Sequence, residues 1–152
     1  MIKEFRYAYV IRKKLIDLVQ SLSVEQLNTI PKGFNNNIAW HFGHLLVSTE
    51  ILCYVRSGVM PEKRIEFAEQ YKNGSRPETF IPQEEINFIT AKMLSSLDDI
   101  ELDYHNGVFQ GIVPYSTHTF GFEIKTIEEV FECCAYHDTV HWGNVLAMKK
   151  LV

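Results

Sequence analysis

The chain has 152 residues, a length that fits one domain, and its 46% hydrophobic, 22% charged and 12% aromatic residues are the composition of a folded globular protein. This composition excludes a disordered chain and a collagen-like repeat. The 15 Lys and Arg against 19 Asp and Glu give a net charge of −4, which argues against a protein that binds nucleic acid, because such a protein needs a basic stripe.

The first half of the sequence predicts two long helices with a short one between them. Residues Ile2–Leu22 contain no Gly or Pro and place apolar side chains at helical spacing. Ser23–Gln26 has the pattern of a capping box, so a short helical turn follows it. Asn35–Asn37 supplies N-cap candidates for a second long helix, Ile38–Arg56, which ends before Gly58.

The second half predicts two more long helices. A mixed stretch after Gly58 contains a short helix at Glu62–Tyr71, and a third long helix covers Gln83–Tyr104. Asn106–Glu123 is rich in glycine and β-forming residues, which indicates a loop with a small hairpin. Thr126–Glu129 is a second capping box, and the last helix runs from there to about Lys150.

Four helices of roughly 18 to 25 residues would each be about 27–38 Å long, which is the dimension of a four-helix bundle. We therefore predict an all-α fold, a four-helix bundle, with residues 1–152 as a single domain. The connection between the second and third long helices is long enough to run back along the bundle, so these two helices can lie parallel to each other.

Two histidines on the last helix are the strongest indication of function. His137 and His141 are four residues apart, so their side chains lie one above the other on one face of a helix. Two imidazoles so placed can bind one metal ion at about 2.0–2.1 Å. They also fall on the apolar seam of the helix, where an imidazole without a partner costs on the order of 1–3 kcal/mol. Until a third ligand is found, hydrogen-bonded core histidines explain the pair equally well.

The third ligand has to come from another helix, and the second long helix offers His41 and His44. Gly43, beside His44, lets a neighbouring helix or a metal ion approach closely, although glycine lowers helix propensity by about 1 kcal/mol. Close packing of two helices alone explains Gly43 equally well.

These motifs resemble those of the DinB-like (damage-inducible) metalloprotein family. The resemblance rests on Trp40-x-x-Gly-His44 and on His137-Asp-Thr-Val-His141-Trp-Gly143. The resemblance covers nearly the whole chain, because the order of the motifs, the lengths of the helices and the long connection between the second and third long helices all agree with it. It implies that His44, His137 and His141 bind one divalent metal ion, that the bundle runs up-down-down-up, and that the protein is a homodimer.

One position departs from the family pattern. Position 41 is often an amide residue in similar sequences, whereas here it is His41. This histidine is a candidate catalytic residue, either as a general base or as a hydrogen-bond donor behind His44. It can equally compete with His44 for the metal or be a hydrogen-bonded residue at the rim.

Three neutral histidines leave at least one coordination position of a bound ion open, which is typical of catalytic rather than structural sites. A water there could have its pKa lowered to about 7, and a thiol could lose its proton. We therefore predict a metal-dependent hydrolase or thiol-dependent transferase that acts on an unknown small molecule, with a low-molecular-weight thiol as one candidate. Nickel, zinc and iron(II) all accept imidazole ligands. The alternative is a non-catalytic bundle that its metal stabilises and that serves as a binding module, and His41 as a fourth ligand would favour it.

Other candidate residues receive a structural interpretation. Asp138 could orient a ring nitrogen of His141, but a solvated acid on the flank of the helix is the simpler interpretation. His105 and His118 lie in or beside turn-rich sequence and are assigned no role. Cys133 and Cys134 are interpreted as buried apolar residues.

Three cysteines do not make a disulfide framework, no signal peptide is visible, and the uncharged runs are too polar to span a membrane. These features predict a cytoplasmic protein that binds no membrane.

Overall fold

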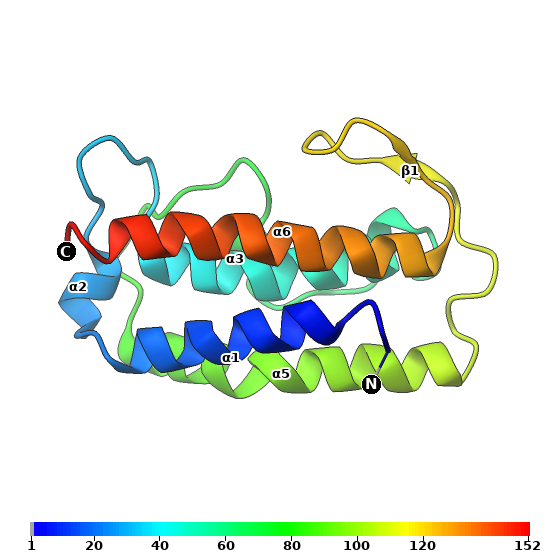
Figure 1. Cartoon of the computed structure of the whole chain (residues 1–152), viewed down its shortest axis with the longest axis horizontal. Helices are drawn as coiled ribbons and strands as arrows, with labels where there is room; N and C mark the ends of the chain where they lie inside the picture. Colours follow the sequence, from blue (N-terminus) through cyan, green and yellow to red (C-terminus); the bar gives the residue numbers. More distant parts are fainter. Residues whose placement is uncertain (1) are drawn as a thin grey trace.

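A computed structural model describes residues 2–152 of the chain, and most of these residues lie in helices. The four longest helices lie side by side along the long axis of the molecule (Figure 1); they are α1 (Arg6–Gln20), α3 (Ile38–Glu50), α5 (Gln83–His105) and α6 (Ile127–Met148). The shorter elements are α2 (Val24–Asn28), the π-helix η1 (Ile51–Arg56), α4 (Ala68–Tyr71) and the antiparallel strands β1 (Tyr115–Ser116) and β2 (Glu123–Ile124). The chain is therefore predominantly helical, as the sequence predicts, with a small two-stranded sheet.

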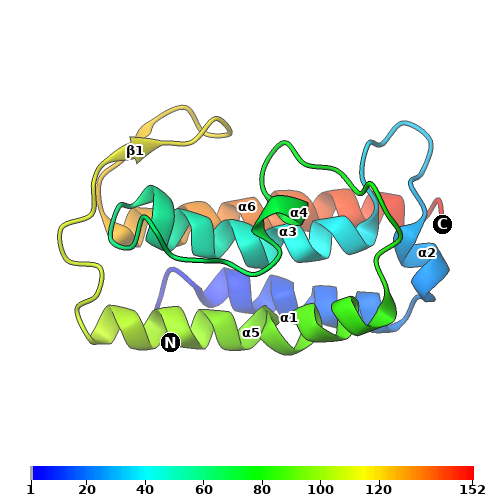
Figure 2. The same ribbon diagram turned by 180° about the vertical axis from the view of Figure 1, so that it is seen from behind.

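The connection between α3 and α5 sets the direction of the long helices. In Figures 1 and 2, α1 and α6 run in one direction along the molecule, and α3 and α5 run in the opposite direction. Residues 57–82 run back along α3 before α5 begins (Figure 2). Two successive long helices can therefore point the same way.

Side-chain caps begin three of the helices where the sequence predicts them. Ser23 and Gln26 form a reciprocal capping box at the start of α2, and Thr126 and Glu129 form another at the start of α6. The side chain of Asn37 accepts a hydrogen bond from the backbone of Trp40 at the start of α3. Each cap satisfies backbone N–H groups that have no partner within the helix.

Two predicted boundaries are wrong, and one predicted helix keeps its boundaries but changes its type. The first helix begins at Arg6 rather than at Ile2, and no side chain caps its start. The short helix expected at Glu62–Tyr71 shrinks to the four residues of α4, because Phe67 adopts a left-handed conformation with φ of 59° that a helix cannot contain. The last six residues of the predicted helix Ile38–Arg56 are π-helical.

The second long helix is the centre of the core. Every residue from Ile38 to Thr49 is buried. Ile38–Arg56 is long and apolar enough to cross a membrane by composition alone, but 72% of its apolar window is buried inside the fold. This is the burial of a core helix, and it explains why α3 carries apolar residues on all of its faces.

The three cysteines are free and buried, as the sequence predicts for Cys133 and Cys134. Burial raises the pKa of the Cys133 thiol to about 12. A thiol with such a pKa stays protonated at neutral pH and is a poor nucleophile.

Candidate metal centre

Three histidines from two helices meet between α3 and α6. One donor nitrogen from each of His44, His137 and His141 lies within 4.8 Å of the other two, an arrangement that could hold a metal ion. Nε2 of His137 lies 3.2 Å from Nε2 of His44 and 3.1 Å from Nε2 of His141. Two nitrogens bound to one ion at about 2.0–2.1 Å are separated by roughly 2.9–3.4 Å, depending on the bond angle. The spacing of the rings therefore fits a single metal ion of unknown identity.

The ring of His44 is oriented by its neighbours. Its Nδ1 lies 2.6 Å from the carbonyl oxygen of Tyr71, and because a carbonyl can only accept, Nδ1 carries the proton and donates it. The indole ring of Trp40 stacks on the same imidazole, with ring centres 4.5 Å apart and planes inclined by 14°. In a neutral ring, Nε2 is then the nitrogen with the lone pair. This is the nitrogen that faces His137 and can bind a metal ion.

The protons of neutral rings cannot satisfy both contacts of His137. A proton on its Nε2 can point to His44 or to His141 but not to both, and without that proton the nitrogen faces the lone pair on His44. On the other side of the ring, Nδ1 of His137 is buried and has no hydrogen-bond partner within residues 2–152. A cation among the three rings would attract the nitrogen lone pairs, which otherwise face each other unfavourably. The site therefore fits a metal.

Burial keeps the three rings neutral at physiological pH. It lowers the pKa of His137 to about 3, with smaller effects from His44 and Arg12, and the pKa of His141 to about 2, with smaller effects from the other histidines. It lowers the pKa of His44 as well. Neutral imidazole is the form that binds metal, so protons do not compete with an ion near pH 7.

His41 lies beside this cluster, in contact with one of its members. Its Nδ1 is 2.6 Å from Nδ1 of His141, so one of the two nitrogens donates a hydrogen bond to the other. The contact is made on the side of the His141 ring opposite to Nε2, which lies against His137. Burial lowers the pKa of His41 to about 4. A neutral hydrogen-bond partner in this place orients the ring of a candidate ligand.

Gly43 makes room for a tyrosine ring. A Cβ atom at position 43 would lie 2.6 Å from two ring carbons of Tyr71, which is closer than such atoms approach. The close neighbour of Gly43 is therefore a helix rather than a metal ion, and it is the short α4 in the connection between α3 and α5. The same Tyr71 whose ring covers Gly43 supplies the carbonyl that holds His44.

Asp138 is fully buried, so its interpretation as a solvated acid is wrong. Its Oδ2 accepts a hydrogen bond of 2.8 Å from Nε of Arg12, which is also fully buried. The remaining guanidinium contacts are to Thr49 Oγ1, Ser96 Oγ, Leu45 O and Met93 O. One arginine of α1 thus binds α3, α5 and α6. Sequence reasoning missed it because Arg12 stands beside Lys13 and Lys14, and nothing local separates a buried cation from exposed ones.

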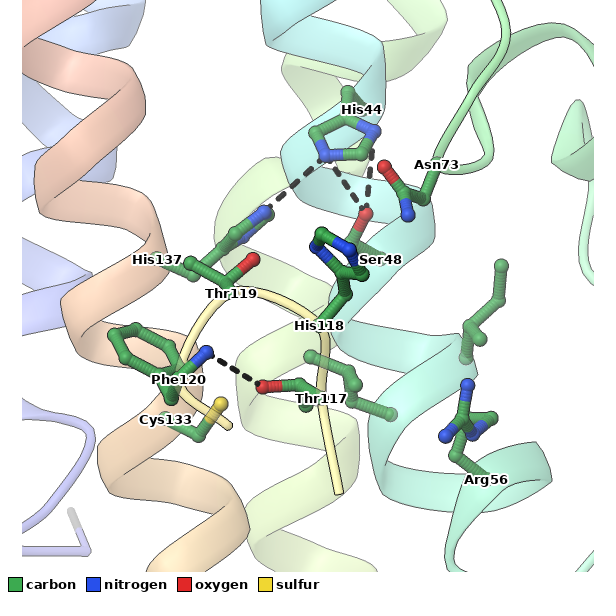
Figure 3. A pocket seen from close by; sticks show the side chains of 12 residues that line it. His44, Ser48, Arg56, Asn73, Thr117, His118, Thr119, Phe120, Cys133 and His137 are labelled. Carbon is green, nitrogen blue, oxygen red and sulfur yellow. Dashed lines mark hydrogen bonds between the residues drawn. The ribbon is translucent and has the colours of Figure 1, made fainter. Parts of the chain in front are cut away.

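Two cavities meet at the cluster, and both are lined by His44 and His137. The inner cavity, of about 160 Å³, extends from these histidines to Arg56 (Figure 3). The outer cavity, of about 550 Å³, is lined by His41, His141 and Arg76 as well. A small molecule in either cavity would lie against the candidate metal ligands.

The loop between the two strands forms one wall of the inner cavity. Figure 3 shows His118 and Thr119 on this loop, between α6 and α3. The sequence predicts no role for His118. A turn-rich segment has no pattern that indicates which helices it will lie against. His105 lies at the exposed C-terminal end of α5, 3.7 Å from Glu101 and outside both cavities.

Comparison with known proteins agrees with the resemblance of the motifs. The model of one protein family, described as the DinB superfamily, matches residues 8–145. The matched region begins in α1, ends in α6 and contains all four histidines of the site. No curated protein matches the chain.

Proposed function

The chain belongs to the DinB superfamily, and from this premise we propose that it is a divalent-metal-dependent enzyme that acts on a small molecule. The proposed ligands are His44, His137 and His141, each through Nε2. One observation carries the proposal: three neutral and largely buried imidazoles converge at ligand spacing, with no carboxylate in the group. Such a set leaves coordination positions free, which is the property of a catalytic metal site.

The surrounding residues support this proposal by preparing the rings for a metal. The Tyr71 carbonyl and the Trp40 indole hold His44, and His41 holds His141 through Nδ1. These contacts fix the orientation of both rings, so little ordering is needed when an ion binds. We propose that His41 is a positioning residue behind His141, rather than a fourth ligand.

When bound, a divalent ion at this site would activate a water or a thiol as a nucleophile. The proposed reaction is therefore hydrolysis, or transfer to a low-molecular-weight thiol. The two cavities support an enzyme over the alternative, a metal-stabilised binding module, because they leave room for a substrate beside the ligands. Nickel, zinc and iron(II) suit the donor set, although an iron oxygenase would need a carboxylate in place of one histidine.

Elemental analysis of the purified protein tests the ligand set. We expect nearly one divalent ion per chain in the parent protein, and a large loss of metal in His137→Ala. The matched control is His105→Ala, because His105 is an exposed histidine outside the site, and this variant should keep its metal. Negligible and equal metal content in the parent and in His137→Ala would overturn the proposal.

The variant His41→Ala distinguishes the proposed enzyme from the alternative, a metal-stabilised binding module. If His41 is a positioning residue, the His41→Ala variant should still bind a full complement of metal at saturation, but its affinity for the metal should be roughly tenfold weaker. A loss of metal as complete as that of His137→Ala would instead indicate four protein ligands and a structural ion. Assays with low-molecular-weight thiols and with ester substrates then separate transfer from hydrolysis.

We also propose that the four long helices are an up-down-down-up bundle, that residues 1–152 form one domain, and that the protein is a cytoplasmic homodimer. The directions of the helices in Figures 1 and 2 support the topology. A molar mass from light scattering tests the dimer.

A further inference from the structure

The two cavities at the histidine cluster have an unusual charge. Within the described residues 2–152, neither is lined by any Asp or Glu, although acidic residues outnumber basic ones in the sequence. Each cavity is lined by one arginine, Arg56 in the inner one and Arg76 in the outer one. The three candidate ligands are neutral, so a bound divalent ion would add two positive charges that no carboxylate in the cavity walls offsets. A space with this charge attracts an anion.

Arg56 is the better placed of the two arginines. Its Nη2 donates a hydrogen bond of 2.9 Å to the carbonyl of Ser116, and its guanidinium lies over the ring of Tyr115, 5.2 Å from the ring centre. The hydroxyl of Tyr115 donates in turn to the carbonyl of Leu52. No carboxylate of residues 2–152 pairs with Arg56. The side chain is exposed, but these two contacts direct it along the loop that lines the cavity, and most of its N–H groups remain available to a ligand.

Arg56 and the histidines lie at opposite ends of the inner cavity (Figure 3). Twelve positions separate His44 from Arg56 along α3 and η1, which is roughly 18 Å of helix axis. Even when the arginine side chain extends toward the cluster, a two-carbon acid cannot meet both ends. A ligand that does so is a chain of several bonds with its acidic group at one end.

We infer that the inner cavity binds an elongated small molecule with a terminal anionic group, which Arg56 holds while the other end faces His44 and His137. This inference deepens the proposed function and rests on it, because the reacting end of the molecule is placed at the metal ligands. Arg56 is then a specificity-determining residue, selecting acids over neutral molecules of equal length.

Cobalt-loaded protein tests the inference with two matched probes. A thiolate bound to Co²⁺ produces an absorption band in the near ultraviolet, so 6-mercaptohexanoate and 6-mercaptohexan-1-ol can be titrated and their dissociation constants compared. We expect the acid to bind at least tenfold more tightly than the alcohol, because the bond to the guanidinium is charge-assisted. In Arg56→Met the ratio should fall to about one, and Arg56→Lys should restore part of it. Arg64→Met is the control, since Arg64 is exposed and lines neither cavity.

Two further comparisons test where the anionic group of the ligand binds. 2-Mercaptoethanesulfonate and 2-mercaptoethanol are too short to span the cavity, and a sulfonate is a poor metal ligand, so these two probes should bind with similar affinity. An equally large preference for the short acid, or a preference that Arg76→Met removes and Arg56→Met does not, would overturn the assignment to Arg56. Equal binding of the two six-carbon probes by cobalt-loaded parent protein would overturn the inference alone. Failure of the parent protein to bind Co²⁺ would overturn the proposed function instead.

Discussion

At the scale of single residues, the site depends on one backbone carbonyl. Tyr71 is almost fully buried, its hydroxyl hydrogen-bonds to Glu85, its ring lies on Gly43, and its carbonyl accepts the proton of His44. Because the ring is held at its far end, it cannot shift without moving the backbone that orients His44. A residue outside the candidate ligand set therefore governs the geometry of one ligand.

Gly43→Ala tests this coupling. The added methyl group forces the Tyr71 ring to move, so we expect the metal dissociation constant to rise roughly tenfold, although alanine favours the helix by about 1 kcal/mol. Gly143→Ala is a matched control on α6, where an added Cβ meets no atom within 4 Å. Competition titration with a chromophoric chelator measures both variants. Equal affinity in the two alanine variants would show that Tyr71 does not transmit the change.

At the scale of the elements, Arg12 joins the four long helices. It lies in α1, pairs with Asp138 of α6, and also donates to groups of α3 and α5. Burial raises the pKa of the Asp138 carboxyl, and the Arg12 guanidinium opposes that effect. Because Asp138 follows His137 directly, the contact between Arg12 and Asp138 sets the position of α6. It thereby sets the position of His137 along the bundle axis relative to His44.

We expect Arg12→Met to lower the free energy of unfolding by about 3–5 kcal/mol, because it leaves Asp138 buried without a partner. The double variant Arg12→Met/Asp138→Leu removes both charges and should regain a large part of that loss. Urea unfolding followed by circular dichroism measures the difference. Arg6→Met, an exposed arginine of the same helix, should change stability by less than about 0.5 kcal/mol. A double variant less stable than Arg12→Met would contradict this account of the ion pair.

At the scale of the whole molecule, the fold limits stability at high pH. Burial raises the pKa of Tyr54, and a hydrogen bond of 2.5 Å to Asp103 adds to the effect. Burial also raises the pKa of Tyr115. In the unfolded chain both phenols ionise near pH 10, so above that pH the unfolded state releases protons that the folded state retains.

Burial raises the pKa of the Cys133 thiol in the same way, and free thiols ionise near pH 8.5. Stability should therefore begin to fall above about pH 9 and fall more steeply above about pH 10, by roughly 1.4 kcal/mol per pH unit for each such tyrosine. Urea midpoints measured between pH 8 and pH 11 give this slope. Tyr54→Phe should reduce it, whatever that variant does to stability at neutral pH. Tyr7→Phe removes a phenol that is 71% exposed, and it should leave the slope as in the parent protein. An unchanged slope in Tyr54→Phe would mean that this phenol does not contribute to the alkaline loss.

Much of this protein could be read from short stretches of sequence. The caps at Ser23, Asn37 and Thr126 and the pairing of His137 with His141 depend on residues within four positions of each other. These features follow from helix geometry, which is the same in any fold. The candidate third histidine came from the family motif, in which its order and spacing are recorded.

Other features could not be read from the sequence, because they join residues far apart along the chain. Arg12 and Asp138 are 126 positions apart, His44 and Tyr71 are 27 apart, and no local pattern announces either contact. Whether Asp138 meets water or an arginine, what covers Gly43, and where His118 lies depend on how the helices and their connections pack. Packing is a property of all the surfaces together, so these contacts become visible only when the whole chain is folded.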